Sequence, residues 1–178
     1  MSLANPKNSA SSVSVIMPVY NEAATVANVI AVVLQQSCVR ELIIVDDCSQ
    51  DGSWEVLQKT AATDSRIKVF RHTVNRGKGA ALRTGILKAD APIVLIQDAD
   101  LEYDPGEYEV LLHPILADKA DVVFGSRFAG AGAHRVLYYW HFLGNRFLTT
   151  LSNMATNLNV TDMAVSYTHL TLPTIYSV

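Results

Sequence analysis

The sequence lacks several features that would assign it to a common class of protein. Its 178 residues include two cysteines and no Cys/His spacing of a zinc site. No apolar stretch reaches the ~20 residues that a membrane span needs, and residues 1–12 contain no apolar run typical of a signal peptide. The net charge is -3, so no global basic field favours binding to nucleic acid.

The two cysteines also indicate the compartment. Cys38 and Cys48 flank a predicted strand, whose ends lie too far apart for a disulfide bond. We therefore expect free thiols in a reducing cytoplasm. Hydrophobic residues make up 49% of the chain and charged residues 17%, which is typical of a globular domain rather than a disordered one.

The patterns that are present alternate between strand and helix. Short apolar runs predict strands at 13–17, 42–47, 67–70, 93–97 and 122–125. Helical patterns are predicted at 26–34, from about Trp54 onward, from Gly79 to about Lys88, after Asp104-Pro105 and at about 136–157. This order predicts an α/β fold with a doubly wound, mostly parallel sheet and helices on both faces.

Polar side chains follow four of the predicted strands. They are Asn21 and Glu22, Asp46 and Asp47, Asp98 and Asp100, and Ser126 and Arg127. Ligands of doubly wound sheets bind beyond the carboxyl ends of the strands. The sequence therefore predicts a binding site at this edge.

The strongest candidate for chemistry is the acidic segment after the fourth strand. Asp98, Asp100 and Glu102 alternate, so an extended chain would point them the same way. Three carboxylates suit a hard divalent cation, Mg²⁺ or Mn²⁺, which could neutralise a departing diphosphate. The alternative is an acidic turn that caps the next helix, although Asp104 already serves that purpose.

Two further strand ends offer groups for a nucleotide. A carboxylate of Asp46 or Asp47 could accept hydrogen bonds from a base or a ribose; alternatively, either could cap the helix near Trp54. Tyr20 supplies an aromatic face beside them, unless it packs in the core.

Basic residues offer groups for phosphate. Lys78 lies at a predicted helix start, between Gly77 and Gly79. The backbone N–H groups of this start could attract an anion, or the segment could be a plain turn with a solvated lysine. Arg127 and Arg146 are candidate phosphate clamps. The aromatic stretch around Arg146 could lie on a membrane or pack on the core. The five histidines show no ligand spacing, and we assign them no role.

Three ordered motifs resemble the inverting glycosyltransferases of family 2, which have the GT-A fold. They are VIMPVYNE at 15–22, ELIIVDDCSQDGS at 41–53 and QDADLEYDP at 97–105, with weaker matches at 75–85, 122–128 and 144–153. Within that family, the sequence is most similar to the polyprenyl-phosphate sugar transferases, such as dolichol-phosphate mannosyltransferase.

The resemblance implies roles for individual residues. The nucleoside would be held by Pro18, Tyr20, Glu22, Val45 and Asp47. Metal and diphosphate would be held by Asp98, Ala99, Asp100 and Glu102. Arg127 and Arg146 would bind a phosphate of the donor or the acceptor. The expected catalytic residues are Asp98 and Asp100, through the metal, and Arg127.

The resemblance also implies a reaction. A sugar would move, with inversion, from a GDP- or UDP-sugar to a polyprenyl phosphate, in a cytoplasmic protein held peripherally at the membrane face. One alternative is a family 2 enzyme that acts on a saccharide hydroxyl in cell-wall or polysaccharide synthesis, which needs a base near the acceptor. The other alternative is a non-catalytic fragment that binds nucleotide without transfer.

The expected organisation has three parts. Residues 1–12 would be disordered, residues 13–163 would form the GT-A catalytic domain, incomplete at its C-terminus, and residues 164–178 would be a non-native tail. This tail, AVSYTHLTLPTIYSV, has no charged residue and resembles translated sequencing-adapter sequence. Its pattern completes neither a helical stripe nor a capped strand, so we expect no regular structure in it.

Overall fold

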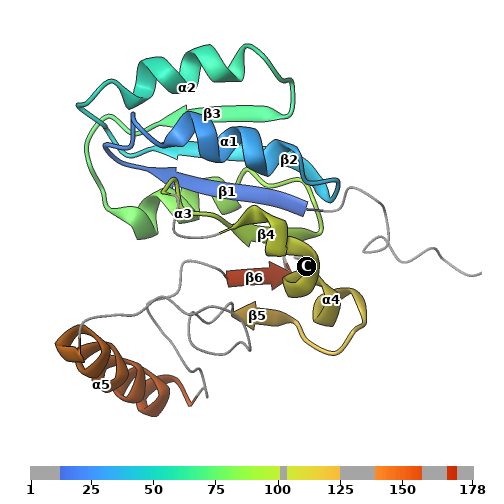
Figure 1. The fold of residues 1–178 in the computed structure, drawn as a ribbon, viewed down its shortest axis with the longest axis vertical. Coiled ribbons are helices and arrows are strands. Elements are labelled where there is room, and N and C mark those ends of the chain that lie inside the picture. The colour runs from blue at the N-terminus through green and yellow to red at the C-terminus, as the bar shows by residue number, and fades with distance from the viewer. Residues whose placement is uncertain (1–12, 101–103, 125–138, 158–167, 172–178) are drawn as a thin grey trace, which may run out of the picture.

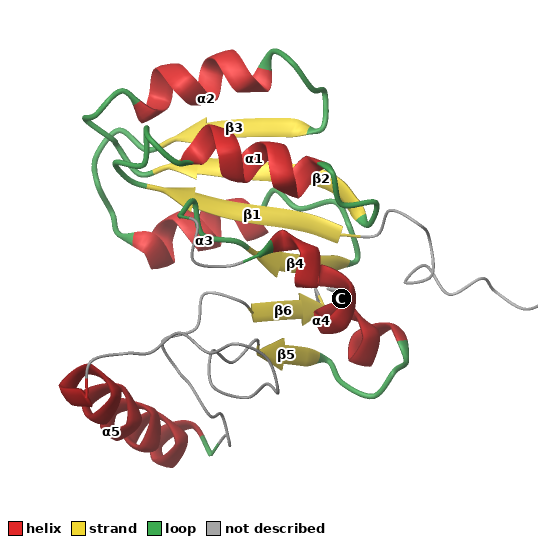
Figure 2. Ribbon diagram, viewed as in Figure 1, coloured by secondary structure: helices red, strands yellow, loops and turns green. Residues whose placement is uncertain are grey.

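The computed structural model describes residues 13–100, 104–124, 139–157 and 168–171. Within these ranges, strands form a single sheet and helices cover both of its faces (Figure 1 and Figure 2). The elements in chain order are β1 (Val13–Val19), α1 (Val26–Leu34), β2 (Val39–Asp46), α2 (Ser53–Ala61), β3 (Ile67–Arg71), α3 (Lys78–Ile86), β4 (Ile93–Ile96), a 3₁₀ turn (Pro105–Glu107), α4 (Tyr108–Leu116), β5 (Val122–Phe124), α5 (Tyr139–Thr156) and β6 (Thr168–Thr171). The predicted α/β class is confirmed.

The strand order is β3-β2-β1-β4-β6-β5. Strands β1 to β4 are mutually parallel, and the chain moves outward from β1 through β2 to β3 before crossing to β4 on the other side of β1. The winding direction therefore reverses between β1 and β4. Ligands of such sheets bind at this switch point, beyond the carboxyl ends of the strands.

The helices bury two separate apolar layers against the sheet. Helices α1, α2 and α4 pack with one face of the strands in the larger core, which includes Ile30, Leu57 and Leu112. Helix α3 covers the other face, where Ala81 packs against Ile16 and Val94. Because both faces are covered, β1 and β2 are buried along almost their whole length and read as continuous apolar runs.

Helix α3 lies unusually close to β1. A Cβ atom placed on Gly85 would come within 2.3 Å of Cγ2 of Ile16, a contact that real side chains do not make. Only glycine allows this approach between the last turn of α3 and the middle of β1. Lys78, the first residue of α3, follows the short loop that leaves the carboxyl end of β3, so the helix begins at the carboxyl edge of the sheet.

The end of the chain differs from expectation at one point. Residues Thr168–Thr171 form β6, which pairs antiparallel with both β4 and β5. The prediction of no regular structure in 164–178 is therefore wrong for these four residues. The short segment Thr-His-Leu-Thr needs only its backbone groups to complete the ladder between two strands. Residues 1–12 lie outside the described residues.

Two smaller predictions also have an outcome. Cys38 and Cys48 are both free thiols, as their separation by a strand predicts. Asp104 caps the 3₁₀ turn before α4, because its side chain accepts a hydrogen bond from the Gly106 N–H at 2.8 Å.

None of the helices in the described part of the chain is long and apolar enough to cross a membrane.

Candidate active site

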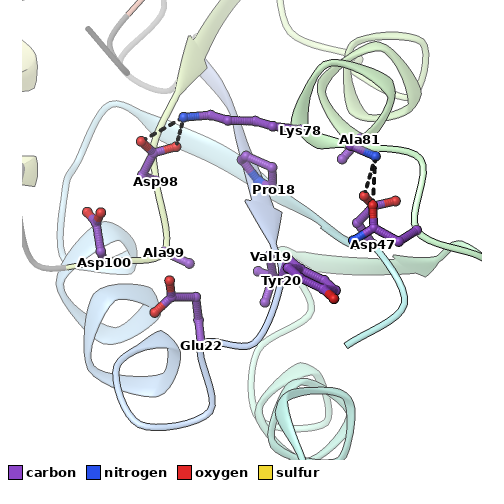
Figure 3. Close-up of a pocket in the computed structure, with 12 residues that line it drawn as sticks. Pro18, Val19, Tyr20, Glu22, Asp47, Lys78, Ala81, Asp98, Ala99 and Asp100 are labelled. Carbon is purple, nitrogen blue, oxygen red and sulfur yellow. Dashed lines mark hydrogen bonds and ion pairs between the residues drawn. The ribbon is translucent and has the colours of Figure 1, made fainter. Parts of the chain in front are cut away.

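A pocket of about 300 Å³ opens at the switch point between β1 and β4 (Figure 3). Its walls come from the ends of β1, β2 and β4 and from the start of α3. The lining residues are Pro18, Val19, Tyr20, Glu22, Asp47, Asn75, Gly77, Lys78, Ala81, Asp98, Ala99 and Asp100. Most of the side chains predicted from the sequence are thus brought together in one place.

The segment after β1 forms one rim of the pocket and is held by the loop after β2. Asn21 has a positive φ of 58°, which turns the chain sharply out of the strand. Its N–H donates to Oγ of Ser49 at 3.0 Å, and the Glu22 N–H donates to Oγ of Ser53 at 2.9 Å. Tyr20 is 47% exposed and lies against the pocket rather than in the core. Its aromatic face is therefore open to a ligand.

The Asp47 carboxylate supports the opposite wall. It is buried and accepts hydrogen bonds from the backbone N–H groups of Arg76 and Gly77, the shortest at 2.7 Å, and contacts Nδ1 of His72 at 2.7 Å. Burial raises the pKa of the Asp47 carboxyl, but the hydrogen bonds from His72, Arg76 and Gly77 outweigh it and hold the pKa below the ordinary 3.8. Asp47 therefore carries its charge and anchors the chain that leads into α3.

His72 was given no role from the sequence, yet it connects two parts of the site. Besides the Asp47 contact, its Nε2 lies 2.9 Å from Oγ1 of Thr84 on α3. Its ring is almost fully buried. The signal that could have identified His72 is its position directly after β3, at the same carboxyl edge as the other polar residues.

Asp46 has a different task from its neighbour. Its buried carboxylate contacts Nε of Arg71 at 3.0 Å and accepts from the Ser49 N–H. Arg71 in turn lies over the Trp54 ring, with its guanidinium carbon 5.1 Å from the ring centroid. Helix α2 begins after Gly52 with no side-chain cap, so the alternative prediction that Asp46 or Asp47 caps this helix is wrong.

The acidic segment after β4 is positioned by buried polar groups. Gln97 is fully buried, accepts from the Tyr108 hydroxyl at 2.7 Å and donates to the Asp98 carbonyl at 3.1 Å. The Thr25 hydroxyl lies 2.9 Å from the Ala99 carbonyl oxygen. These contacts fix the backbone that presents Asp98 and Asp100 to the pocket.

Lys78 reaches across the pocket to Asp98 (Figure 3). Its Nζ lies 2.7 Å from Oδ1 and 2.9 Å from Oδ2 of that carboxylate. The Asp98 side chain is 14% exposed and that of Lys78 is 52% exposed. Asp98 is thus mostly buried, and both of its carboxylate oxygens are paired with the Lys78 ammonium.

The arrangement fits a hard divalent cation. Asp98 and Asp100 both line the pocket and offer oxygen ligands, and the ammonium of Lys78 already occupies a cation position on Asp98. Among the described residues, no three His, Cys, Asp or Glu side chains gather into a complete metal cage. The predicted third ligand, Glu102, lies outside the described residues. Two carboxylates suit an ion that takes its remaining ligands from water and a diphosphate.

The other predicted site residues are placed elsewhere. Val45 is fully buried in the core beneath α3, with Ile43 and Ala81, so its side chain does not reach the pocket. This placement arises because alternate residues of β2 face α3, and the role of Val45 toward a nucleoside stays a prediction. Arg146 is exposed on α5 and is absent from the pocket lining. Arg127 lies outside the described residues.

Comparison with known proteins identifies the family. Residues 14–168 match the family described as glycosyl transferase family 2. The chain belongs to glycosyl transferase family 2. The expectation of a family 2 glycosyltransferase domain is thereby confirmed.

Relatives within glycosyl transferase family 2 share moderate identity. The chain is 31% identical over 122 residues to dolichol-phosphate mannosyltransferase from Pyrococcus furiosus. This alignment covers 67% of this chain and 34% of that protein. It is 27% identical over 162 residues to UDP-N-acetylglucosamine–dolichyl-phosphate N-acetylglucosaminyltransferase from Methanococcus voltae, covering 83% and 64%. The chain thus spans between about a third and two thirds of the length of these relatives.

A solved structure supports the fold. Glucosyl-3-phosphoglycerate synthase from Mycobacterium tuberculosis, in complex with Mn²⁺, UDP and glucosyl-3-phosphoglycerate, aligns with a TM-score of 0.67. The alignment covers 93% of this chain and 58% of that one, at 21% identity. The predicted GT-A glycosyltransferase fold is confirmed.

Proposed function

We propose that this chain is the catalytic part of an enzyme that moves a sugar from a nucleoside-diphosphate sugar to a polyprenyl phosphate, with inversion. The observation that carries the proposal is the pocket at the switch point, where Asp98 and Asp100 meet Lys78 and Tyr20. The two dolichyl-phosphate transferases among its relatives support the choice of acceptor.

The donor would lie along the rim between β1 and β4. Tyr20 offers an exposed aromatic face for a base, and Ala99 also lines the pocket. Glu22 and the buried Asp47 bound this part of the pocket. Asp47 contributes by holding the Arg76–Gly77 backbone, since its oxygens already accept protein hydrogen bonds.

The diphosphate would lie beside Asp98 and Asp100. These two carboxylates would hold Mg²⁺ or Mn²⁺. When bound, the cation would neutralise the charge that develops on the leaving diphosphate. The chain itself keeps Asp98 and Asp100 in place through Gln97, Tyr108 and Thr25. This support matters because small displacements of bound groups lower transfer rates strongly.

The acceptor chemistry needs little help with protons. A polyprenyl phosphate is already an anion at neutral pH, so it requires orientation and charge balance more than a strong base. Arg127 and Arg146 are the proposed clamps for this phosphate. Arg146 lies on the exposed side of α5, where an acceptor can approach.

Helix α5 is proposed to rest on the cytoplasmic face of a membrane. Trp140, Leu143, Phe147, Leu151 and Met154 recur at three- and four-residue steps, so they form one stripe, and Trp140 and Met154 are 75% and 77% exposed. The helix contains no acidic residue, which favours an anionic lipid surface. Sedimentation with anionic vesicles tests this placement.

The proposed activity is tested by lipid extraction. The chain is incubated with Mn²⁺, dolichyl or undecaprenyl phosphate in detergent, and a panel of radiolabelled GDP- and UDP-sugars. We expect label in the organic phase, and its loss in Asp98→Asn. Label that appears only on added saccharides would favour the polysaccharide alternative, and nucleotide binding without any transfer would favour the non-catalytic fragment.

A further inference from the structure

The ion pair between Lys78 and Asp98 spans the centre of the proposed diphosphate site. Nζ of Lys78 contacts both oxygens of Asp98, at 2.7 and 2.9 Å, and both residues line the pocket. A divalent cation bound to Asp98 would lie about 2.0–2.6 Å from one of these same two carboxylate oxygens. Two cations so close together repel each other, so the ammonium and the metal compete for Asp98.

The structure allows Lys78 to move without disturbing its backbone. The chain before α3 is anchored, because the N–H groups of Arg76 and Gly77 donate to the buried Asp47. The Lys78 side chain is 52% exposed, so the long stem has room to rotate in the pocket. Displacement from Asp98 would therefore change a rotamer rather than the fold of the loop.

We propose that Lys78 is a placeholder cation: it neutralises Asp98 before the donor arrives, is displaced by the metal, and then pairs with the donor diphosphate. The inference rests on the proposed function for its last step only. It explains why a lysine at the start of α3 is aimed at a carboxylate that should also bind a metal. Lys78 thus lowers the affinity of the site for a metal ion when no nucleotide is present. It raises the affinity for the nucleotide once the metal is bound.

This dual role gives Lys78→Met opposite effects on two affinities. Without the competing ammonium, Mn²⁺ alone should bind more tightly, by at least about fivefold, the lower end of typical coupling between sites. With Mn²⁺ saturating, UDP or GDP should bind about tenfold more weakly, because a charge-assisted contact to phosphate is lost. A residue with a purely structural role would weaken both.

The experiment measures each affinity separately. Free Mn²⁺ is followed by its paramagnetic resonance signal, and UDP and GDP are titrated by calorimetry in saturating Mn²⁺. The matched control is Lys59→Met, which removes an exposed lysine on α2 and should change neither affinity. The added change Asp98→Asn should abolish the gain in Mn²⁺ affinity seen in Lys78→Met.

The outcomes separate this inference from the proposed function. Equal or weaker Mn²⁺ binding by Lys78→Met would overturn the placeholder role, even where nucleotide binds normally. Wild-type protein that binds neither UDP nor GDP with Mn²⁺ would overturn the proposed function. In that case a tighter Mn²⁺ affinity in Lys78→Met would still support the competition at Asp98.

Discussion

Nδ1 of His72 lies 2.7 Å from Oδ1 of Asp47, and both side chains are buried at the carboxyl edge of the sheet. His72 also contacts Thr84 on α3 through Nε2, at 2.9 Å. Because Asp47 holds the N–H groups of Arg76 and Gly77, this pair ties the end of β2 to the chain that enters α3. One wall of the pocket depends on that connection.

Replacing His72 should therefore affect both stability and binding. His72→Ala removes one of the hydrogen-bond partners of the buried Asp47 charge, which should lower the free energy of unfolding by about 1–3 kcal/mol. The Arg76–Gly77 backbone should loosen, so UDP and GDP should bind more weakly. Urea denaturation and calorimetry measure the two effects.

The matched control for that change is His113→Ala, which removes an exposed histidine from α4. It should change neither quantity. His72→Asn should recover part of the binding, because an amide can still donate to Asp47. Unchanged nucleotide affinity in His72→Ala would show that the pocket wall does not depend on this pair.

A second buried carboxylate should make stability depend on pH. Burial raises the pKa of Glu41, but hydrogen bonds from Lys68, Ser14 and the Asp90 N–H outweigh it and hold the pKa below its ordinary 4.5. A depressed pKa in the folded state stabilises the protein above pH 4.5, and this stability is lost as the pH falls through the folded pKa.

The change Glu41→Gln tests that dependence. The variant should be less stable near neutral pH, because Lys68 loses one of its two charged partners, the Glu41 carboxylate at 2.7 Å, and keeps Asp90. Its free energy of unfolding should also fall less steeply than that of wild type on acidification below about pH 5. Denaturation in urea at a series of pH values compares it with Glu55→Gln, an exposed control on α2. Parallel pH curves for Glu41→Gln and wild type would contradict the account.

Glycines in α3 should respond oppositely to alanine. Gly85→Ala places a Cβ 2.3 Å from Cγ2 of the buried Ile16, so α3 must shift, at a cost of about 1–3 kcal/mol. Gly79→Ala in the same helix meets no atom within 4 Å and should be neutral or stabilising by up to about 1 kcal/mol. Thermal unfolding distinguishes them, and equal melting temperatures would show that α3 does not pack as described.

Much of the fold could be predicted because β1, β2 and β4 each contain a run of apolar residues, and β3 keeps an apolar pattern at Ile67, Val69 and Phe70. Such runs mark strands covered on both faces, and each was placed within about three residues of its observed ends. The strand β6 was missed, because four residues without an alternating apolar pattern give no sequence signal. It pairs through its backbone with β4 on one side and β5 on the other.

The site was predictable in location and less so in detail. The rule that ligands bind beyond strand ends brought Tyr20, Asp98 and Asp100 together correctly. It could not reveal which oxygens are already used within the protein, as those of Asp47 are. It also could not give the face of Val45 or the partner of Lys78, since both depend on how α3 lies on the sheet.

The central claim is that Asp98 and Asp100 hold a divalent cation together with a nucleoside diphosphate. The most direct measurement is calorimetric titration of UDP and GDP, with and without Mn²⁺, into wild type, Asp100→Ala and the control Asp90→Asn, whose carboxylate pairs with Lys68 outside the pocket. The account predicts that Mn²⁺ strengthens binding in wild type and Asp90→Asn and has no effect in Asp100→Ala. Equal Mn²⁺-dependent affinity in all three proteins would contradict it.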